Sequence, residues 1–381
     1  MSPLLFPLYS LTAWIMVGSG FAVFQPGPCT FDGDSLRLKV GQMVMAGFRG
    51  LTVDEMSPIV RDIVGLGLGG VILFDYDVET KSPVRNISGP AQLRRLTSTL
   101  QRFSRIPLLI AVDQEGGKVS RLKRKHGFPD SPSQASLGGT GRPEKTREYA
   151  MATGRLLNSH GVNVNFAPVL DVNVNPENPV IGRLERSYSS DPDSVVLHGR
   201  AALEGMRCAG MLAAVKHFPG HGSSRDDSHL GLVDVTETWS QAEMKPFAAL
   251  IAEGLCDMVM TAHVYHRGID SLYPATLSRR FVTGILRDSL GFDGVIVTDD
   301  LQMRAIREHY GLETAVRLAV EAGNDILLFA NNTDSFDEGI ARKAVAALLR
   351  LVEDGTIPAE RIDASYRRIM ELKARLRDRG Q

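Results

Sequence analysis

The chain has 381 residues, so at roughly 100–200 residues per domain its length suggests two domains or one large one. Its 43 basic and 44 acidic side chains give a formal net charge of −1, which argues against a dedicated nucleic-acid-binding protein, because such proteins usually carry a basic excess. The 43% share of apolar residues excludes a disordered chain, and three cysteines without a CxxC pair exclude a disulfide scaffold and a cysteine-based zinc site.

The N-terminal segment differs in composition from the rest of the chain. Residues 1–31 contain no charged side chain, and residues 4–24 are largely apolar. Such a leader is typical of a secretory signal or of a single membrane anchor. The positively charged start that usually accompanies both is missing, so an extended start upstream of the domain is the alternative. We expect export or membrane anchoring in the first two cases and a cytoplasmic protein in the third.

From residue 35 onward, short apolar runs alternate with amphipathic stretches. Eight runs are rich in Val, Ile and Leu and nearly continuous, which is typical of parallel strands covered on both faces. These predicted strands are Gln42–Phe48, Gly70–Asp75, Leu108–Gln114, Asn163–Asp171, Ala213–Phe218, Met258–His263, Gly294–Asp300 and Asp325–Ala330.

The stretches between these runs have the apolar spacing of helices. The predicted helices are Ala91–Phe103, Asp193–Met206, Ala242–Glu253, Ser278–Leu290 and Glu313–Ala322. Ser240 and Glu243 have the spacing of a capping box, and Ser278 is a second candidate cap. Ala341–Leu351 and Pro358–Arg377 are predicted as two further helices near the C-terminus.

Eight strands separated by helices is the count of a (β/α)8 barrel, although a doubly wound open sheet has a similar alternation. The GxGxxG at residues 65–70 leads into a strand, whereas a dinucleotide-binding loop follows a strand and opens a helix. It therefore indicates a helix end and a turn. We predict an α/β protein, a single TIM-like (β/α)8 barrel over residues 35–381 with extra C-terminal helices, and no cofactor.

In such a barrel the active site lies at the C-terminal ends of the strands. A polar residue at one strand end is usually only a cap for the next turn, and Asp75 or Asn331 can be interpreted in that way. Polar residues at seven successive strand ends instead favour a shared site. They are Asp75, Asp113, Glu115, Asp171, Lys216, His217, His263, Asp299, Asp300, Asn331 and Asn332.

The segment 216–229, after the fifth strand, contains three of the nine histidines, His217, His221 and His229. Together with Asp227 they allow a zinc site in principle. An HxxxH pair binds metal on a helix, however, and the Pro-Gly pair at 219–220 prevents a helix here. We therefore predict no metal site.

Asp227 and His229 point the same way in an extended loop. A carboxylate beside an imidazole raises its pKa and fixes its tautomer, which makes a general acid near neutral pH. With Asp299 held at a strand end, this pair suits double displacement at an acetal carbon, the carboxylate acting as nucleophile. The simpler interpretation is that Asp227 and His229 only order the loop. No GxSxG elbow supports serine hydrolysis.

The run KHFPGHG at 216–222 resembles the signature of glycoside hydrolase family 3 β-N-acetylhexosaminidases, the NagZ-type enzymes of peptidoglycan turnover. The resemblance starts near Lys39 and includes AVDQEGG at 111–117, FAPVLDVN at 166–173 and VTDDLQM at 297–303. It implies a retaining barrel enzyme with Asp299 as nucleophile, His229 as acid/base and Asp227 as its partner. It also implies that the terminal sugar is bound by Asp113, Arg121, Arg186, Lys216 and His217.

The chain departs from the family pattern in two places near the site. Residues 183–185 form a longer segment than the pattern has, so Arg183 competes with Arg186 for the sugar. Val233 stands where the family often has a proline shortly after the acid/base. His263 and Asp300 are further candidate site residues at strand ends.

The resemblance implies an exo-acting β-N-acetylglucosaminidase that hydrolyses terminal β-linked GlcNAc, with peptidoglycan-derived muropeptides or GlcNAc–anhydroMurNAc as substrates. We expect a monomer whose partner is a small carbohydrate, with no nucleic acid and no membrane contact except through an N-terminal anchor. The alternatives are a β-glucosidase-like or a phosphorolytic family 3 glycosidase, and a non-catalytic sugar-binding protein.

Overall fold

The computed structural model describes residues 35–227, 231 and 233–378. The predicted leader at 1–31 and the predicted acid/base His229 lie outside the described residues. From Leu36 onward the chain forms one compact unit. Within the described part, no helix combines the length and the apolar character that a membrane crossing requires.

Eight parallel strands form the wall of a barrel. They are β1 (Val44–Gly47), β2 (Gly70–Ile72), β3 (Leu109–Val112), β4 (Val164–Asn165), β5 (Leu212–Phe218), β7 (Met258–Thr261), β9 (Val295–Thr298) and β10 (Leu327–Phe329). Their order around the sheet is β10-β1-β2-β3-β4-β5-β7-β9. A single parallel bridge between Val297 and Ile326 brings β9 to the start of β10, so the ring is nearly closed. The predicted (β/α)8 barrel is confirmed, and the open sheet is excluded.

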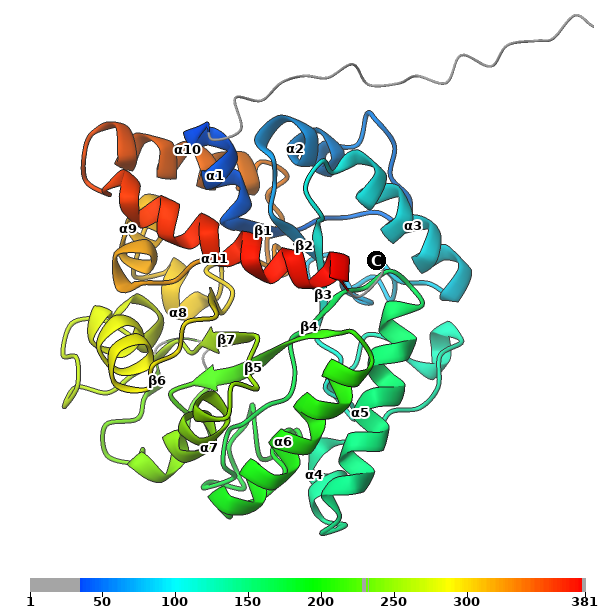
Figure 1. Ribbon diagram of the computed structural model, residues 1–381, viewed down its shortest axis with the longest axis vertical. Helices are drawn as coiled ribbons and strands as arrows, with labels where there is room; N and C mark the ends of the chain where they lie inside the picture. Colours follow the sequence, from blue (N-terminus) through cyan, green and yellow to red (C-terminus); the bar gives the residue numbers. More distant parts are fainter. Residues whose placement is uncertain (1–34, 228–230, 232, 379–381) are drawn as a thin grey trace, which may run out of the picture. The chain divides into compact units, whose positions relative to one another are not determined.

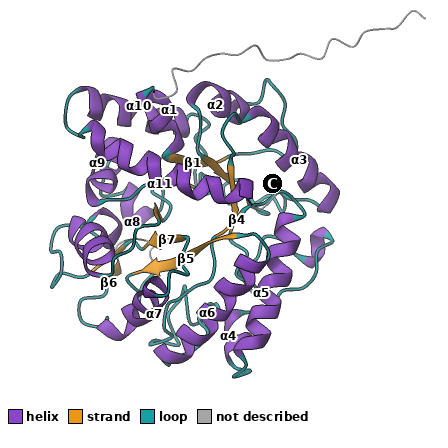
Figure 2. Cartoon of the chain, in the orientation of Figure 1, coloured by secondary structure: helices purple, strands orange, loops and turns teal. Residues whose placement is uncertain are grey.

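Helices surround the strands (Figures 1 and 2). The α-helices are α1 (Leu36–Gln42), α2 (Pro58–Leu66), α3 (Pro90–Phe103), α4 (Gln134–Gly138), α5 (Pro143–Asn158), α6 (Pro192–Cys208), α7 (Gln241–Ala252), α8 (Arg304–Arg307), α9 (Leu312–Ala322), α10 (Ile340–Glu353) and α11 (Ala359–Asp378). The smaller elements are η1 (Arg124–His126), η2 (Ala275–Leu277), the π-helix η3 (Arg280–Ser289), β6 (Val233–Asp234) and β8 (Val264–Tyr265). Every predicted helix is present with ends within two residues, whereas α1, α2, α4, α5 and α8 were not predicted.

The fourth predicted strand is shorter than its apolar run. The run spans residues 163–171, but only Val164 and Asn165 belong to β4. Pro168 follows closely, and because it has no N–H it cannot donate to a strand ladder. Val169 then makes an isolated bridge with Lys216, so the chain returns to β5 just before Asp171. The interruption shortens the strand without moving its polar end away from the barrel rim.

Two predicted caps have different outcomes. Ser278 accepts a hydrogen bond from the Phe281 N–H through its hydroxyl oxygen at 3.3 Å, as an N-terminal cap does. Ser240 precedes α7, but its hydroxyl makes no capping bond, so this half of the predicted capping box is wrong. The Glu243 carboxylate accepts instead from the Ser223 N–H, because α7 packs against the loop that follows β5.

The glycine-rich segment at 65–70 ends a helix, as predicted. Helix α2 stops at Leu66, and Gly67 has a left-handed conformation with φ of 65°. This is the usual geometry after a helix C-terminus, where glycine avoids the steric cost of a side chain. The chain then enters β2 at Gly70.

The two ends of the barrel are different. At the N-terminal end, α11 crosses the starts of β1 and β2 (Figure 1), and the buried Lys373 Nζ donates to Gln42 Oε1 at 2.6 Å and to the Gly69 carbonyl at 2.8 Å. At the C-terminal end, the loops leave an open pocket. This is the end at which (β/α)8 barrels carry their chemistry.

Candidate active site

A pocket of about 460 Å³ opens at the C-terminal ends of the strands. The predicted site residues that line it are Asp113, Arg121, Arg186, Lys216, His217, Asp227, Asp299 and Asp300. Arg183 and His263 do not line it. A larger groove of about 1060 Å³ lies on the flank of the barrel near η3 and α9, and contains none of the predicted site residues. The fold therefore brings most of the predicted site together in one pocket.

Asp113, which follows β3, is held between two cations. Lys216 Nζ lies 2.8 Å from Asp113 Oδ1, and Arg121 Nη2 donates to Asp113 Oδ2 at 3.0 Å. Burial alone would raise the pKa of Asp113, but Lys216 and Arg121 outweigh it and hold that pKa below its usual range. Asp113 therefore remains a carboxylate in a fixed position at neutral pH.

Glu115 lies deeper and binds two of the pocket's cations. Arg186 donates to both of its oxygens, at 2.7 and 2.8 Å, and Lys216 Nζ lies 2.6 Å from Oε1. Burial would raise the pKa of Glu115, but the charges of Arg186 and Lys216 lower it. Arg186 also donates to the Val180 carbonyl. Glu115 thus fixes the orientation of both side chains.

His217 is oriented by a buried aspartate. Its Nδ1 lies 2.6 Å from Asp171 Oδ2, while Asp171 Oδ1 accepts the backbone N–H groups of His217 and His221. On the other side of the ring, Arg186 Nη2 lies 3.1 Å from Nε2. Because a guanidinium can only donate, these contacts fit the tautomer with the proton on Nδ1. The ring therefore has little freedom to rotate.

Glu115 and Asp171 were noted in the sequence only as polar strand ends. Glu115 lies two residues after Asp113, and Asp171 lies at the end of the fourth predicted strand. These positions indicate a place at the rim, but they do not indicate which side chains the two carboxylates contact. We call the set that they organise the charged wall. It consists of Asp113, Glu115, Asp171, Arg186, Lys216 and His217.

Asp299 follows β9, and a backbone hydrogen bond to the end of β7 holds it at the rim of the barrel. Its N–H donates to the Thr261 carbonyl at 3.1 Å, and its Oδ1 accepts the Asp300 N–H at 2.8 Å. Asp300 Oδ1 accepts the N–H groups of Gln302 and Ala330. Asp300 thereby fastens the turn after β9 to the end of β10, which sets the position of Asp299.

The loop from Pro219 to Asp227 follows β5 and places the Asp227 carboxylate at the pocket. A Cβ on Gly222 would lie 1.7 Å from the Val172 carbonyl oxygen, so only glycine fits there. The Asn178 side-chain amide donates to the carbonyls of His221 and Gly222. The loop is therefore held against the barrel up to the point at which Asp227 lines the pocket.

Glu243 of α7 lies beneath this loop and is completely buried. Its Oε2 accepts the Ser223 N–H at 3.0 Å. Burial raises the pKa of Glu243 to about 7, although the hydrogen bonds from Ser223 partly offset this effect. Among the described residues no basic side chain pairs with it, in contrast to the carboxylates of the charged wall.

Two further candidates lie outside the pocket. Arg183 is exposed and pairs with Glu177 at 2.8 Å, in a neighbouring open groove, whereas Arg186 reaches the pocket. His263 is buried, with Nδ1 3.0 Å from Thr276 Oγ1 and Nε2 2.9 Å from the Asp300 carbonyl. His263 therefore supports the turn after β9 from behind.

The histidines of the KHFPGHG segment are engaged with protein groups. His221 Nδ1 lies 2.8 Å from Ser224 Oγ, and burial lowers the pKa of His221 to about 4. Between residues 35 and 378, leaving aside the undescribed positions, no group of three or more His, Cys, Asp or Glu side chains is placed to hold a metal ion. The donors at this end of the barrel are instead arranged as ion pairs.

A (β/α)8 barrel with carboxylates and cations at its strand ends defines a TIM-barrel enzyme. The chain belongs to glycosyl hydrolase family 3, because residues 35–372 match the "Glycosyl hydrolase family 3 N terminal domain". The predicted family resemblance is confirmed.

Curated relatives agree with this family. The chain is 37% identical over 333 residues to "Beta-hexosaminidase A" of Pseudoalteromonas piscicida, a match that covers 81% of this chain and 54% of that protein. It is 38% identical over 309 residues to "Beta-hexosaminidase" of Thiobacillus denitrificans, covering 75% of this chain and 82% of the relative. The chain thus spans about half of the first relative and most of the second.

Solved structures show the same fold. The family 3 beta-N-acetylglucosaminidase of Paenibacillus sp. superposes with a TM-score of 0.83 at 41% identity, over 91% of this chain and 64% of that one. The Beta-N-acetylhexosaminidase of Beutenbergia cavernae superposes with a TM-score of 0.80 at 31% identity, over 90% of this chain and 99% of that one.

Proposed function

We propose that the protein is a retaining exo-β-N-acetylglucosaminidase that releases terminal β-linked GlcNAc from the non-reducing end of peptidoglycan-derived fragments. The observation that carries this proposal is the placement of Asp299 and Asp227 in the same strand-end pocket as the charged wall. The names of the relatives support the choice of sugar, since they are beta-hexosaminidases and beta-N-acetylglucosaminidases.

In this proposal the charged wall, together with Arg121, holds the terminal sugar. Asp113 accepts hydrogen bonds from sugar hydroxyls, while Lys216, Arg186 and Arg121 donate to hydroxyl or amide oxygens. The cations are already fixed by Glu115 and Asp113, so little side-chain entropy is lost when the sugar binds. A neutral sugar fits such a site because it is bound by directed hydrogen bonds and needs no electrostatic attraction from the net charge of the protein.

The chemistry is a double displacement. Asp299 attacks the anomeric carbon and forms a glycosyl ester, while His229, partnered by Asp227, protonates the leaving glycosidic oxygen as the C–O bond breaks. His229 then takes a proton from water, whose oxygen bonds to the anomeric carbon as the bond to Asp299 breaks. Two inversions leave the product with the β configuration of the substrate.

The test is turnover of a panel of aryl β-glycosides, with the first-formed anomer identified by NMR. We expect preference for β-GlcNAc, a β-configured first product and a fall in kcat of at least about 10³-fold in Asp299→Ala. Asp293→Ala is the matched control, because Asp293 is an exposed aspartate before β9 whose removal should leave turnover unchanged.

Three results would overturn parts of this proposal. Full activity in Asp299→Ala would remove the assigned nucleophile. A first product with the α configuration would exclude a retaining mechanism. Formation of GlcNAc-1-phosphate when inorganic phosphate is present would identify a phosphorylase instead of a hydrolase.

A further inference from the structure

The pocket has a second wall, opposite the charged wall in the order of the strands. The charged wall comes largely from the ends of β3, β4 and β5, and the second wall comes from the ends of β2 and β10 and the loops that follow them, with Arg49 of the loop after β1 behind it. These three strands are neighbours in the other half of the barrel. Tyr76 and Val78 are the exposed hydrophobic residues that line the pocket in this half. The other lining residues of this half are Ile72, Phe74, Asp75, Leu328, Ala330, Asn332 and Thr333.

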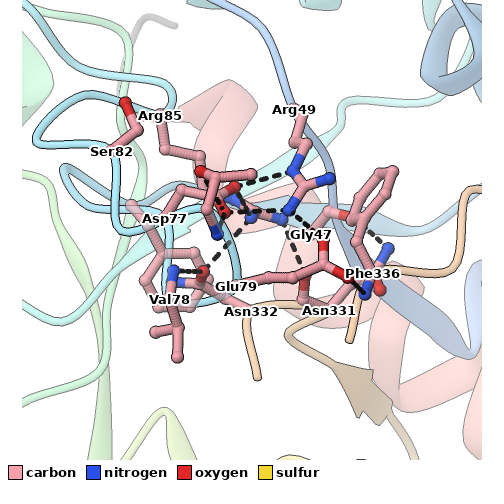
Figure 3. Close-up of polar contacts among 12 residues, drawn as sticks. Gly47, Arg49, Asp77, Val78, Glu79, Ser82, Arg85, Asn331, Asn332 and Phe336 are labelled. Carbon is pink, nitrogen blue, oxygen red and sulfur yellow. Dashed lines mark hydrogen bonds and ion pairs between the residues drawn. The ribbon is translucent and has the colours of Figure 1, made fainter. Parts of the chain in front are cut away.

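The Asn332 side chain holds the segment 76–78 through hydrogen bonds to the backbone of that segment. Its side-chain Oδ1 accepts the Val78 N–H at 3.0 Å, and its Nδ2 donates to the Tyr76 carbonyl at 3.0 Å. Figure 3 shows this amide beside the turn that it holds. Because both ends of the amide are used, the three-residue segment is attached to the loop after β10 at two points.

Asp77, between these two residues, is buried and does not line the pocket, and its carboxylate contacts Arg49 and Arg85 (Figure 3). Arg49 donates to both Asp77 oxygens, at 2.7 and 2.8 Å, and Arg85 forms a further ion pair with it. The hydrogen bond from Arg49 is the main reason that the pKa of Asp77 lies well below its usual range. Arg85 also donates to the Asn331 carbonyl, which joins the loop after β2 to the loop after β10.

This arrangement leaves two apolar side chains at the pocket. Tyr76 is 39% exposed and Val78 is 42% exposed, although the segment that carries them is rigidly attached. We call residues 76–78, with Arg49, Arg85 and Asn332, the clamped wall. Its buried charges support the segment, and its pocket-facing surface carries an aromatic ring and an isopropyl group.

We propose that Tyr76 and Val78 form the surface that contacts the leaving saccharide and so determine how strongly the site prefers a saccharide leaving group. The inference rests on the proposed function, which already requires a saccharide to leave, and it assigns residues to that saccharide. The face of an aromatic ring is electron-rich and attracts the C–H groups on the apolar face of a sugar. A ring that is mounted on a fixed backbone loses little freedom when it is covered, so its contact contributes efficiently to binding.

The position of the wall agrees with this assignment. Asp299 follows β9, which lies next to β10 in the ring, so the proposed nucleophile stands between the charged half and the clamped half. A glycoside whose terminal sugar is held by the charged wall, with its anomeric carbon at Asp299, then directs its leaving group toward the remaining half of the pocket. That half is the clamped wall.

The experiment compares two substrates that differ in the leaving group. N,N′-diacetylchitobiose leaves a pyranose, whereas β-GlcNAc azide leaves a group without a ring. We expect Tyr76→Ala to lower kcat/KM on the disaccharide about tenfold, the value of one favourable aromatic contact, and to change the azide reaction less than about twofold. Tyr76→Phe should keep most of the wild-type rate on both, because the ring face remains.

The control is Leu272→Ala, since Leu272 is an exposed apolar residue on the flank of the barrel and should affect neither substrate. An equal loss on both substrates in Tyr76→Ala, or no loss on either, would overturn the leaving-group subsite. If the wild-type protein hydrolyses neither substrate, the proposed function fails first, and that result is distinct from a failure of the subsite.

Discussion

The two walls of the pocket use buried carboxylates in opposite ways. In the charged wall, Glu115 and Asp113 hold Lys216 and Arg186 at the pocket surface. In the clamped wall, Asp77 holds Arg49 and Arg85 away from the pocket, and Tyr76 and Val78 are the exposed hydrophobic side chains that line it.

The difference shows that an ion network has no single function in a barrel rim. Where the cations line the pocket, the network fixes hydrogen-bond donors at the pocket surface. Where the cations lie away from the pocket, the same kind of network holds the backbone of a segment whose other side chains line the pocket. Substitutions in the two networks should therefore be equally destabilising but should affect catalysis in different ways.

The largest effect is expected for Glu115→Gln in the charged wall. The change leaves Arg186 buried with a neutral partner and removes one of the two carboxylates that pair with Lys216, so the free energy of unfolding should fall by about 3 kcal/mol. Displacement of these donors should also lower kcat/KM by about 100-fold on every substrate. Urea unfolding and steady-state kinetics measure the two effects.

The matched control for this change is Glu177→Gln. Glu177 pairs with Arg183 through the same kind of contact, but both side chains are exposed. Exposed pairs contribute about 0–1 kcal/mol, so little change is expected in stability or kinetics. A large kinetic loss in Glu177→Gln would indicate that Arg183, rather than Arg186, reaches the sugar.

Asp77→Asn should separate stability from general catalysis. Loss of the charge between Arg49 and Arg85 should lower the free energy of unfolding by about 3 kcal/mol. The change affects the backbone segment that positions Tyr76 and leaves the charged wall intact. We therefore expect kcat/KM to fall on N,N′-diacetylchitobiose and to stay near the wild-type value on β-GlcNAc azide. Equal losses on both substrates would show that the clamped wall also positions the terminal sugar.

Glu79→Gln is the control for the clamped wall. Glu79 pairs with the same Arg49, at 2.6 Å, but its side chain is 39% exposed. Its removal should change the free energy of unfolding by about 0.5 kcal/mol or less. A result as large as that for Asp77→Asn would mean that burial does not distinguish the two partners of Arg49.

The effect expected for Glu243→Gln is on the pH dependence of stability. The pKa of Glu243 is about 7 in the folded protein and near its ordinary value of 4.5 when unfolded, so the folded state binds the proton more tightly. Its contribution is full below pH 4.5 and is lost as pH rises toward 7, by up to about 3 kcal/mol in wild type. Thermal unfolding across this range should show a weaker pH dependence in Glu243→Gln.

Glu253→Gln, at the end of the same helix, should change the pH dependence of stability in the opposite direction. The hydrogen bond from Arg200 lowers the pKa of Glu253, so its contribution is present at neutral pH and is lost as pH falls. If Glu243→Gln and Glu253→Gln changed the pH dependence in the same direction, the buried carboxyl would not be the source of the effect.

The strands and their polar ends could be predicted because they depend on local pattern. Each strand is a buried run of apolar residues, and the carboxyl ends of parallel strands meet at one rim, so Asp113, Lys216 and Asp299 follow from position alone. The KHFPGHG segment added the family, and the match over residues 35–372 agrees with it.

The partners of these residues could not be predicted, because they come from loops that are distant in the sequence. Arg186 lies 71 residues from Glu115, and Arg85 lies 247 residues from Asn332. Ser240 and Glu243 have the spacing of a capping box, but Glu243 turns to Ser223 because α7 packs under a loop.

The sequence by itself therefore determined the barrel, the rim that carries the chemistry and the family. Only the tertiary structure decided that Arg186 and not Arg183 lines the pocket, and that one ion network lines this pocket while the other supports the segment of Tyr76 and Val78. The physical reason is that periodicity and residue type are properties of neighbouring residues. Burial and charge pairing depend on which loops meet when the barrel closes.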